Sequence, residues 1–205
     1  MRVLFQGDSI TDASRNREND NNQGRGYPTL IQSKLMFEYP GEYEFFNRGI
    51  GGNRITDLIA RMKIDMINLK PDVMSILIGV NGVWHEVSRA NGVRAELYEK
   101  MYNLLIAELK AALPELRIMI MEPYVMEGTA TTEHWDYFRT EVKLRAEAAK
   151  RVAEKNGLEF IPLQDKFEEA CRKMPVEYWL RDGVHPTAAG HELIAREWLK
   201  TFFNK

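Results

Sequence analysis

The sequence predicts an α/β fold: a five-stranded parallel sheet with helices on both faces. Short apolar runs alternate with longer amphipathic stretches along the chain, which is typical of parallel strands connected by helices. One run, residues 73–78, is almost continuously apolar, as expected for a strand that helices cover on both faces. No internal repeat, low-complexity segment or linker interrupts the pattern, so we expect a single domain over residues 1–205.

The strands and helices follow from the spacing of the apolar residues. Strands are predicted at residues 2–6, 43–47, 73–78, 117–121 and 159–162. Helices are predicted at residues 27–39, 54–69, 96–113, 132–156 and 165–174, with a closing helix after Thr187, its expected N-cap. Residues 12–26 form a long polar segment between the first strand and the first helix. We interpret it either as a lid, binding rim or oligomer contact, or as a tolerated insertion.

Composition excludes several classes of function. An apolar fraction of 44% and a charged fraction of 28% are ordinary for a globular protein, and a net charge of −2 gives no strong attraction to nucleic acid or to an anionic membrane. Cys171 is the only cysteine, so neither an intrachain disulfide nor a cysteine-based zinc site can form. The chain has no apolar run of membrane-spanning length and no signal-peptide pattern at its start. We therefore expect a soluble cytoplasmic protein with no nucleic-acid or membrane partner.

Polar or glycine-rich residues follow three of the predicted strands. Ser9 comes directly after the first strand, which ends at Gly7, and ligands of open α/β sheets bind beyond the carboxyl ends of strands. On this stretch alone Ser9 is either a nucleophile or a turn former or N-cap.

Residues 47–53 are rich in glycine but lack the spacing of a dinucleotide or phosphate loop. They form either a plain turn or a place where backbone N–H groups face a ligand. Residues 79–86 are a further cluster after a strand.

Acyl transfer by a serine needs a base, a carboxylate that orients the base, and donors for the oxyanion. Of the four histidines, His134 and His191 fall in predicted helices, whereas His185 lies in a loop three residues after Asp182, and His85 lies in the cluster after the third strand. Asp182 can accept a hydrogen bond from His185; the alternative is a surface Asp and a His that caps the last helix. The sequence has neither a His-Glu-x-x-His pattern nor a Cys/His cluster, and it lacks the Gly-x-Ser-x-Gly elbow of α/β-hydrolases.

Four short blocks resemble the signature blocks of the SGNH (GDSL) hydrolases, in the same order and over nearly the full chain. They are Gly-Asp-Ser-Ile-Thr at residues 7–11, Asn-Arg-Gly-Ile-Gly-Gly-Asn at 47–53, Gly-Val-Asn at 79–81 and Asp-Gly-Val-His-Pro at 182–186. The resemblance implies a three-layer α/β/α sandwich of the flavodoxin-like type and a serine esterase that needs no cofactor or metal. It implies Ser9 as nucleophile and Asp182 and His185 as acid and base. It also implies an oxyanion hole of the Ser9 and Gly52 backbone and the Asn81 amide.

One residue departs from the family pattern. Gly82 stands where the third block usually has Asp, so we expect a less rigid loop around Asn81.

Within the family the chain is similar to bacterial intracellular acetyl-xylooligosaccharide esterases, on residues 12–26, Trp84, Pro123-Tyr124 and the final His-Pro-Thr-Ala-Ala-Gly-His. This similarity implies a short-chain ester substrate, an acetylated carbohydrate, and homo-oligomers, which are frequent among those relatives. Asp8, Trp84 and Tyr124 are the expected substrate contacts, and Trp84 either stacks on a sugar or only packs. The alternatives are a broader esterase, a lysophospholipase or thioesterase, and a non-catalytic carbohydrate-binding relative.

Overall fold

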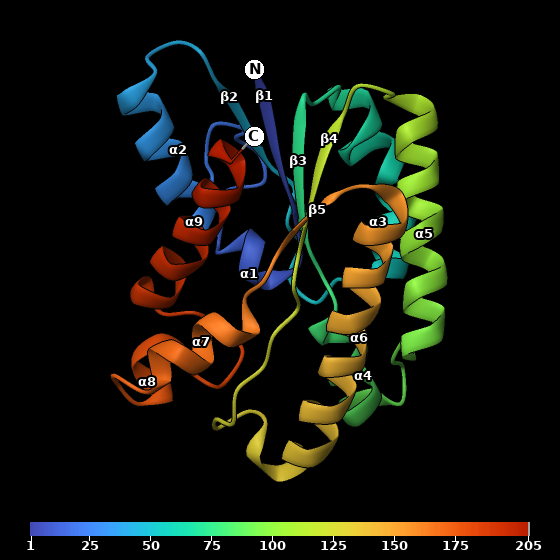
Figure 1. Ribbon diagram of the computed structural model, residues 1–205, viewed down its shortest axis with the longest axis vertical. Helices are drawn as coiled ribbons and strands as arrows, with labels where there is room; N and C mark the ends of the chain where they lie inside the picture. Colours follow the sequence, from blue (N-terminus) through green and yellow to red (C-terminus); the bar gives the residue numbers. More distant parts are fainter. Residues whose placement is uncertain (205) are drawn as a thin grey trace.

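The computed structural model describes residues 1–204 and contains a five-stranded parallel sheet in the order β2-β1-β3-β4-β5 (Figure 1). The strands are β1 (Arg2–Gly7), β2 (Glu44–Asn47), β3 (Val73–Leu77), β4 (Arg117–Met121) and β5 (Glu159–Ile161). All neighbouring pairs are parallel. The prediction of an α/β fold with a five-stranded parallel sheet is confirmed, and each strand lies within two residues of its predicted bounds.

Six helices correspond to the predicted ones: α2 (Tyr27–Glu38), α3 (Ile55–Asp65), α5 (Ala95–Ala112), α6 (Trp135–Asn156), α7 (Gln164–Cys171) and α9 (Ala188–Phe203). Thr187 is the N-cap of α9, as predicted, and its side chain accepts from the Gly190 N–H. Three helices were not predicted: α1 (Ser9–Asp12), α4 (Val80–Arg89) and α8 (Val176–Trp179). The 3₁₀ turns η1 (Ile67–Leu69) and η2 (Thr132–His134) lie within the ranges predicted as helices, next to α3 and α6.

The helices cover both faces of the sheet, which gives the predicted three layers. Figure 1 shows α2 and α9 on one face and α3, α5 and α6 on the other. Alternate residues of β1 enter the two cores: Phe5 packs in the core under α2 and α9, and Leu4 in the core under α3 and α5. Trp198 of α9 is fully buried against Phe5, with ring centroids 5.6 Å apart. These cores hold the ends of the strands in fixed positions.

The direction of winding reverses between β1 and β3. The chain leaves β1 for α1 and α2 on one face of the sheet, and it leaves β3 for α4 and α5 on the other (Figure 1). Such a switch point opens a crevice at the carboxyl ends of the two strands, and ligands of doubly wound sheets bind there. Ser9 follows β1 and Asn81 follows β3, so the topology brings both to this crevice.

Residues 12–26 pack against the end of β2 and are not a loosely attached insertion. The buried Arg15 side chain donates from Nε to the Gly49 carbonyl at 3.0 Å. The buried Gln23 donates from Nε2 to the Phe45 carbonyl at 3.1 Å, and the backbone carbonyl of Gln23 accepts from Asn47 Nδ2 at 2.8 Å. The segment is therefore built into the edge of the crevice.

Candidate active site

Close contacts at the end of β1 fix the position of Ser9. A Cβ on Gly7 would lie 2.4 Å from the Leu77 carbonyl, so only glycine fits beside β3 at this point. Asp8 caps α1 by accepting from the Ile10 N–H at 3.0 Å. Ser9 is then the first residue of α1, where its own N–H has no acceptor within the helix. The nucleophile candidate therefore stands on a sharp strand-to-helix turn.

Ser9, His185 and Asp182 form a continuous chain of hydrogen bonds. Ser9 Oγ lies 3.0 Å from His185 Nε2, and His185 Nδ1 lies 2.7 Å from Asp182 Oδ2. The other carboxylate oxygen of Asp182 accepts the N–H groups of Val184 and His185, at 2.9 and 2.8 Å. The structure thus brings together three residues that are separated by up to 176 positions in the sequence.

The pKa values of Asp182 and His185 suit a histidine base that a carboxylate orients. Burial raises the pKa of Asp182, but the hydrogen bonds from the His185 side chain and from two backbone N–H groups outweigh burial and lower that pKa to about 2. The hydrogen bond to Asp182 raises the pKa of His185, against the opposite effect of its burial. Asp182 therefore stays ionised near neutral pH and holds the proton on Nδ1, which leaves Nε2 to accept from Ser9.

The loop that carries the acid and base is anchored to the segment after β4. Gly183 has φ of +96°, a conformation that favours glycine. Its carbonyl accepts from the Met126 N–H at 2.9 Å, and the Asp182 carbonyl accepts from the Ala130 N–H at 3.1 Å. Within the loop, the Arg181 N–H donates to the His185 carbonyl at 2.8 Å. These bonds hold the loop, and with it Asp182 and His185, in a fixed position.

The predicted oxyanion donors lie on two segments beside Ser9. Gly52 has φ of +82° in the turn after β2, and no acceptor for its N–H occurs among residues 1–204. Asn81 is buried at the start of α4, and its Nδ2 donates to the Asn53 carbonyl at 3.1 Å. That bond uses one N–H of the amide, and the second N–H has no acceptor among the described residues.

Arg61 ties the segment that carries Gly52 to β1, and sequence reasoning missed this residue. Its guanidinium donates to Asn53 Oδ1 and to the Arg48 carbonyl, both at 2.8 Å, and to Gln6 Oε1 at 2.6 Å. In the sequence Arg61 is only one charged residue on an amphipathic helix, so no local pattern indicated its role.

The expected loosening around Asn81 is wrong. Asn81 and Gly82 lie in the first turn of α4, and the Gly82 carbonyl accepts from the Val93 N–H at 3.0 Å. A Cβ on Gly82 would lie 3.3 Å from Nε of the buried Arg145. This Nε has no partner, whereas the other nitrogens of Arg145 donate to Glu141 and to the Val93 carbonyl. A packed arginine therefore borders the position that usually carries Asp.

The three predicted substrate contacts have different surroundings. Tyr124 is only 1% exposed and packs on Phe167, so it is a core residue and the prediction of a substrate contact is wrong. Asp8 is equally buried, and burial raises its pKa to about 6, so it supports α1 and is not placed to contact substrate. Trp84 is half-buried between Phe138 and His185, 5.8 Å from the His185 ring, and its exposed part borders the site.

A cavity of 610 Å³ opens beside Ser9 and His185. Its wall includes the start of α9, the buried His191 and two exposed arginines, Arg25 and Arg181. Sequence reasoning missed both arginines, although Arg181 directly precedes Asp182. The volume is in the range of pockets for small ligands.

Within residues 1–204, no group of three or more His, Cys, Asp and Glu side chains is arranged to hold a metal ion. Over the same residues, no helix has the length and apolar character needed to cross a membrane.

Comparison with known proteins agrees with this geometry. The model of the GDSL-like Lipase/Acylhydrolase family matches residues 5–193. An acetylxylan esterase from Geobacillus stearothermophilus is 32% identical, over 97% of this chain and 92% of its own. A protein from Parabacteroides merdae whose structure is described as a GDSL-like lipase superposes with a TM-score of 0.93 at 33% identity, covering 98% of this chain and 94% of its own.

The acetylxylan esterase from Geobacillus has also been solved in several variants. A catalytic mutant at an aspartate superposes with a TM-score of 0.89 at 31% identity, covering all of this chain and 94% of the other. Other catalytic mutants of that esterase replace a serine and a histidine. Its catalytic residues are therefore of the same three types as the hydrogen-bonded Ser9, His185 and Asp182 of this protein. Another variant replaces a tryptophan that immediately precedes that aspartate. The chain described here belongs to the GDSL-like lipase/acylhydrolase family and is a carboxylic ester hydrolase.

Proposed function

We propose that this protein is a serine esterase that removes short acyl groups, acetyl above all, from carbohydrates such as xylo-oligosaccharides, through an acyl-enzyme. The observation that carries the proposal is the hydrogen-bonded chain from Ser9 Oγ through His185 to Asp182, at 3.0 and 2.7 Å. Similarity to the acetylxylan esterase from Geobacillus supports the acetyl and carbohydrate parts of the proposal.

In the proposed mechanism Ser9 Oγ attacks the ester carbonyl while His185 Nε2 takes its proton. The N–H groups of Ser9 and Gly52 and the amide of Asn81 stabilise the oxyanion. His185 then gives the proton to the leaving alcohol, and the acyl group remains on Ser9. Water attacks this acyl-enzyme with His185 as base, which releases the acid and restores the serine. Asp182 stays ionised throughout and stabilises the protonated imidazole.

The wall of the cavity favours a polar alcohol over a long acyl chain. Side chains that bear hydrogen-bonding groups make up most of it, so this cavity is not a continuous apolar channel. A lysophospholipase would need such a channel to bury an acyl chain, because apolar burial supplies the affinity for that part of the substrate. Trp84 beside His185 offers one aromatic face on which we propose that a sugar ring stacks.

A panel of substrates tests the proposal: acyl chains of increasing length on one leaving group, beside acetylated xylo-oligosaccharides, with acid release measured. We expect the highest kcat/KM for acetyl, with acetate released from the sugars, and no activity in the Ser9→Ala variant. A higher kcat/KM on octanoyl than on acetyl esters would favour the lysophospholipase or thioesterase alternative. Binding of oligosaccharides without hydrolysis of any ester would favour the non-catalytic relative.

We also propose that the protein is cytoplasmic and forms homo-oligomers. The single cysteine supports a reducing compartment, and exposed apolar side chains on α2, above all Phe37 with 86% exposure, support self-association. Light scattering after size exclusion should give a mass above one chain, and Phe37→Ser should reduce it. Fractionation of the source cells tests the location.

A further inference from the structure

The 610 Å³ cavity lies where the leaving alcohol of an ester has to be. Ser9 and His185 line it, but the oxyanion residues Gly52 and Asn81 and the aromatic Trp84 do not. In acyl transfer the alcohol must reach His185 Nε2 to receive its proton, whereas the carbonyl oxygen turns toward the oxyanion donors. The cavity is therefore placed to bind the alcohol part of the substrate.

Two arginines in the cavity wall have no anionic partner. Neither the Arg25 nor the Arg181 guanidinium has an acceptor or ion pair among residues 1–204. In contrast, Arg17 from the same segment is paired with Asp12 at 2.7 Å. Asp12 is the one carboxylate in the wall, and its Oδ2 also accepts from the Gly51 N–H at 3.2 Å, so its charge is already compensated. The free charge of the cavity wall is positive.

Buried and backbone donors face the same cavity. His191 is only 6% exposed and lines the cavity, and its Nδ1 accepts from the Tyr27 N–H at 3.2 Å, which leaves the ring proton on Nε2. Nε2 has no partner among the described residues. Burial, with the charges of Arg181 and His185, lowers the pKa of His191 to about 4, so the ring is a neutral donor. The amino end of α9, a helix of 16 residues, adds unsatisfied N–H groups and the positive end of its dipole at Ala188.

We propose that this cavity binds a carboxylate on the alcohol part of the ester, so that the preferred substrates are acyl esters of acidic sugars. Arg25 and Arg181 bind the charge, and His191 and the start of α9 donate to its oxygens. This inference rests on the proposed function and adds a substrate class to it. In the Geobacillus esterase a tryptophan immediately precedes the catalytic aspartate, whereas Arg181 precedes Asp182 here. The positive charge at this position is therefore a feature of this chain that the Geobacillus esterase lacks.

Matched esters test the proposal. The acetates of para-hydroxybenzoate and para-hydroxybenzamide have the same shape and differ in charge, and acetylated xylo-oligosaccharides with and without a uronic acid branch give the carbohydrate pair. The measurement is the ratio of kcat/KM between the anionic and the neutral member. We expect kcat/KM to be about ten times higher for the anionic member at low salt, because its KM is lower. This ratio should decline as added salt screens the arginines. The acetate of para-hydroxyphenyl phosphate tests the alternative anion.

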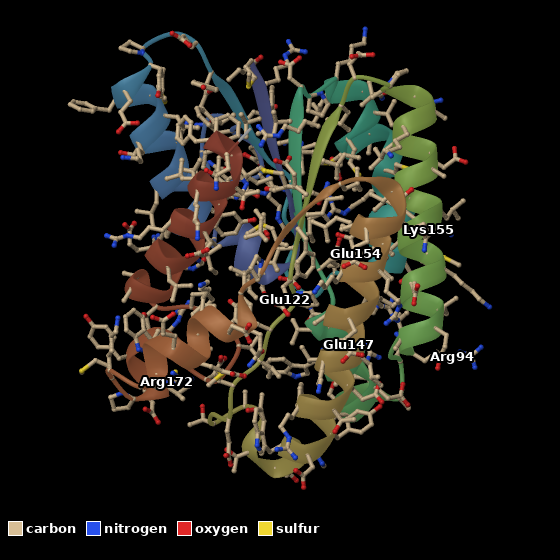
Figure 2. The ribbon with its side chains drawn as sticks, viewed as in Figure 1. Arg94, Glu122, Glu147, Glu154, Lys155 and Arg172 are labelled. Atoms are coloured by element: carbon tan, nitrogen blue, oxygen red, sulfur yellow. The ribbon has the colours of Figure 1, made fainter. Side chains whose placement is uncertain are left out.

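Variants of the two arginines test whether these side chains cause the preference for the anionic ester. Arg25→Gln and Arg181→Gln should each lower the ratio about threefold, and the double variant should bring it close to one. Arg172→Gln is the matched control, because Arg172 is also exposed but lies at the end of α7 outside the cavity (Figure 2). It should leave the ratio unchanged.

The outcomes separate the two proposals. Hydrolysis of neutral and anionic acetates with equal kcat/KM would overturn the acidic-sugar proposal and leave the esterase intact. A preference that survives in the double variant would also overturn it, as would a stronger preference for the phosphate than for the carboxylate. Failure to hydrolyse any of these esters would count against the proposed function itself.

Discussion

The two sides of the crevice are held in different ways. On the side of the proposed oxyanion donors, Gly52 and Asn81 belong to segments that partly buried hydrogen bonds fix, through Arg61 and through the Asn53 carbonyl. On the side proposed for the alcohol, the Arg25 and Arg181 side chains are exposed and have no partner within the described chain. Groups that must be in place before the transition state forms are held rigidly, since reorganisation would add to the barrier. Groups that select the substrate can stay open to solvent. Damage to the first side should therefore lower turnover.

The largest effect is expected from the base. His185→Ala should lower kcat by about 10⁴-fold or more, because Ser9 then loses the group that takes its proton. His85 is the control. It also lies near the site, since a Cβ on Gly52 would be 3.8 Å from its Nε2, yet it forms no hydrogen bond to Ser9. His85→Ala should keep kcat within a few-fold of the parent. The reverse result in steady-state kinetics would mean that His85 is the base.

The next largest effect is expected from the oxyanion donor on α4. Asn81→Ala should lower kcat by about 10²–10³-fold with little change in KM, because the donor serves the oxyanion more than the ground-state carbonyl. Asn81→Asp keeps the shape but removes both N–H groups, and it should be at least as damaging. Thermal unfolding of each variant checks that α4 is intact. Full kcat in a folded Asn81→Ala enzyme would show that Ser9 and Gly52 hold the oxyanion alone.

The pH profile gives an effect of intermediate size. His185 must be neutral to act as base, so kcat/KM should fall as the pH drops through its pKa. The hydrogen bond to Asp182 raises that pKa, which places the acid limb above the ordinary value of 6.5. Burial and the nearby arginines 54 and 89 lower the pKa of His85, so a limb below 6.5 would point to that histidine instead. Asp8, with a pKa of about 6, is a further titrating neighbour whose charge also raises the pKa of His185, so Asp8→Asn should keep the limb but move it to lower pH.

The smallest effect is expected on stability at Gly82. This glycine has no positive φ, so its backbone accepts a side chain, although the added Cβ would lie 3.3 Å from both the Val93 carbonyl and Arg145 Nε. An Asp would give the unpaired Nε of Arg145 an acceptor. Gly82→Asp should raise the free energy of unfolding by about 1 kcal/mol. Gly82→Ala is the control, because it supplies helix propensity without an acceptor. Chemical denaturation that finds the Ala variant as stable as the Asp variant, or more so, would contradict the pairing.

Patterns that lie within one segment could be read from the sequence, and contacts between segments could not. The apolar runs predicted all five strands, and the resemblance to known signature blocks predicted Ser9, Asn81 and the Asp182–His185 pair as site residues. The helix α4 was missed because Val80, Asn81 and Gly82 are poor helix formers that packing holds in place. Tyr124 follows a strand in the sequence, yet its side chain turns into the core. Arg25 and Arg181 line one cavity only because the fold brings distant parts of the chain together, which no periodicity in the sequence indicates.

The central claim is that Ser9 is the nucleophile of an acyl-enzyme, and covalent labelling tests it most directly. The protein is treated with a fluorophosphonate probe, and the modified peptide is identified by mass spectrometry. Activation by His185 at 3.0 Å predicts that the label is found on Ser9 alone and disappears in the Ser9→Ala and His185→Ala variants. Labelling that persists in a folded Ser9→Ala protein, or that maps to another serine, would contradict the account.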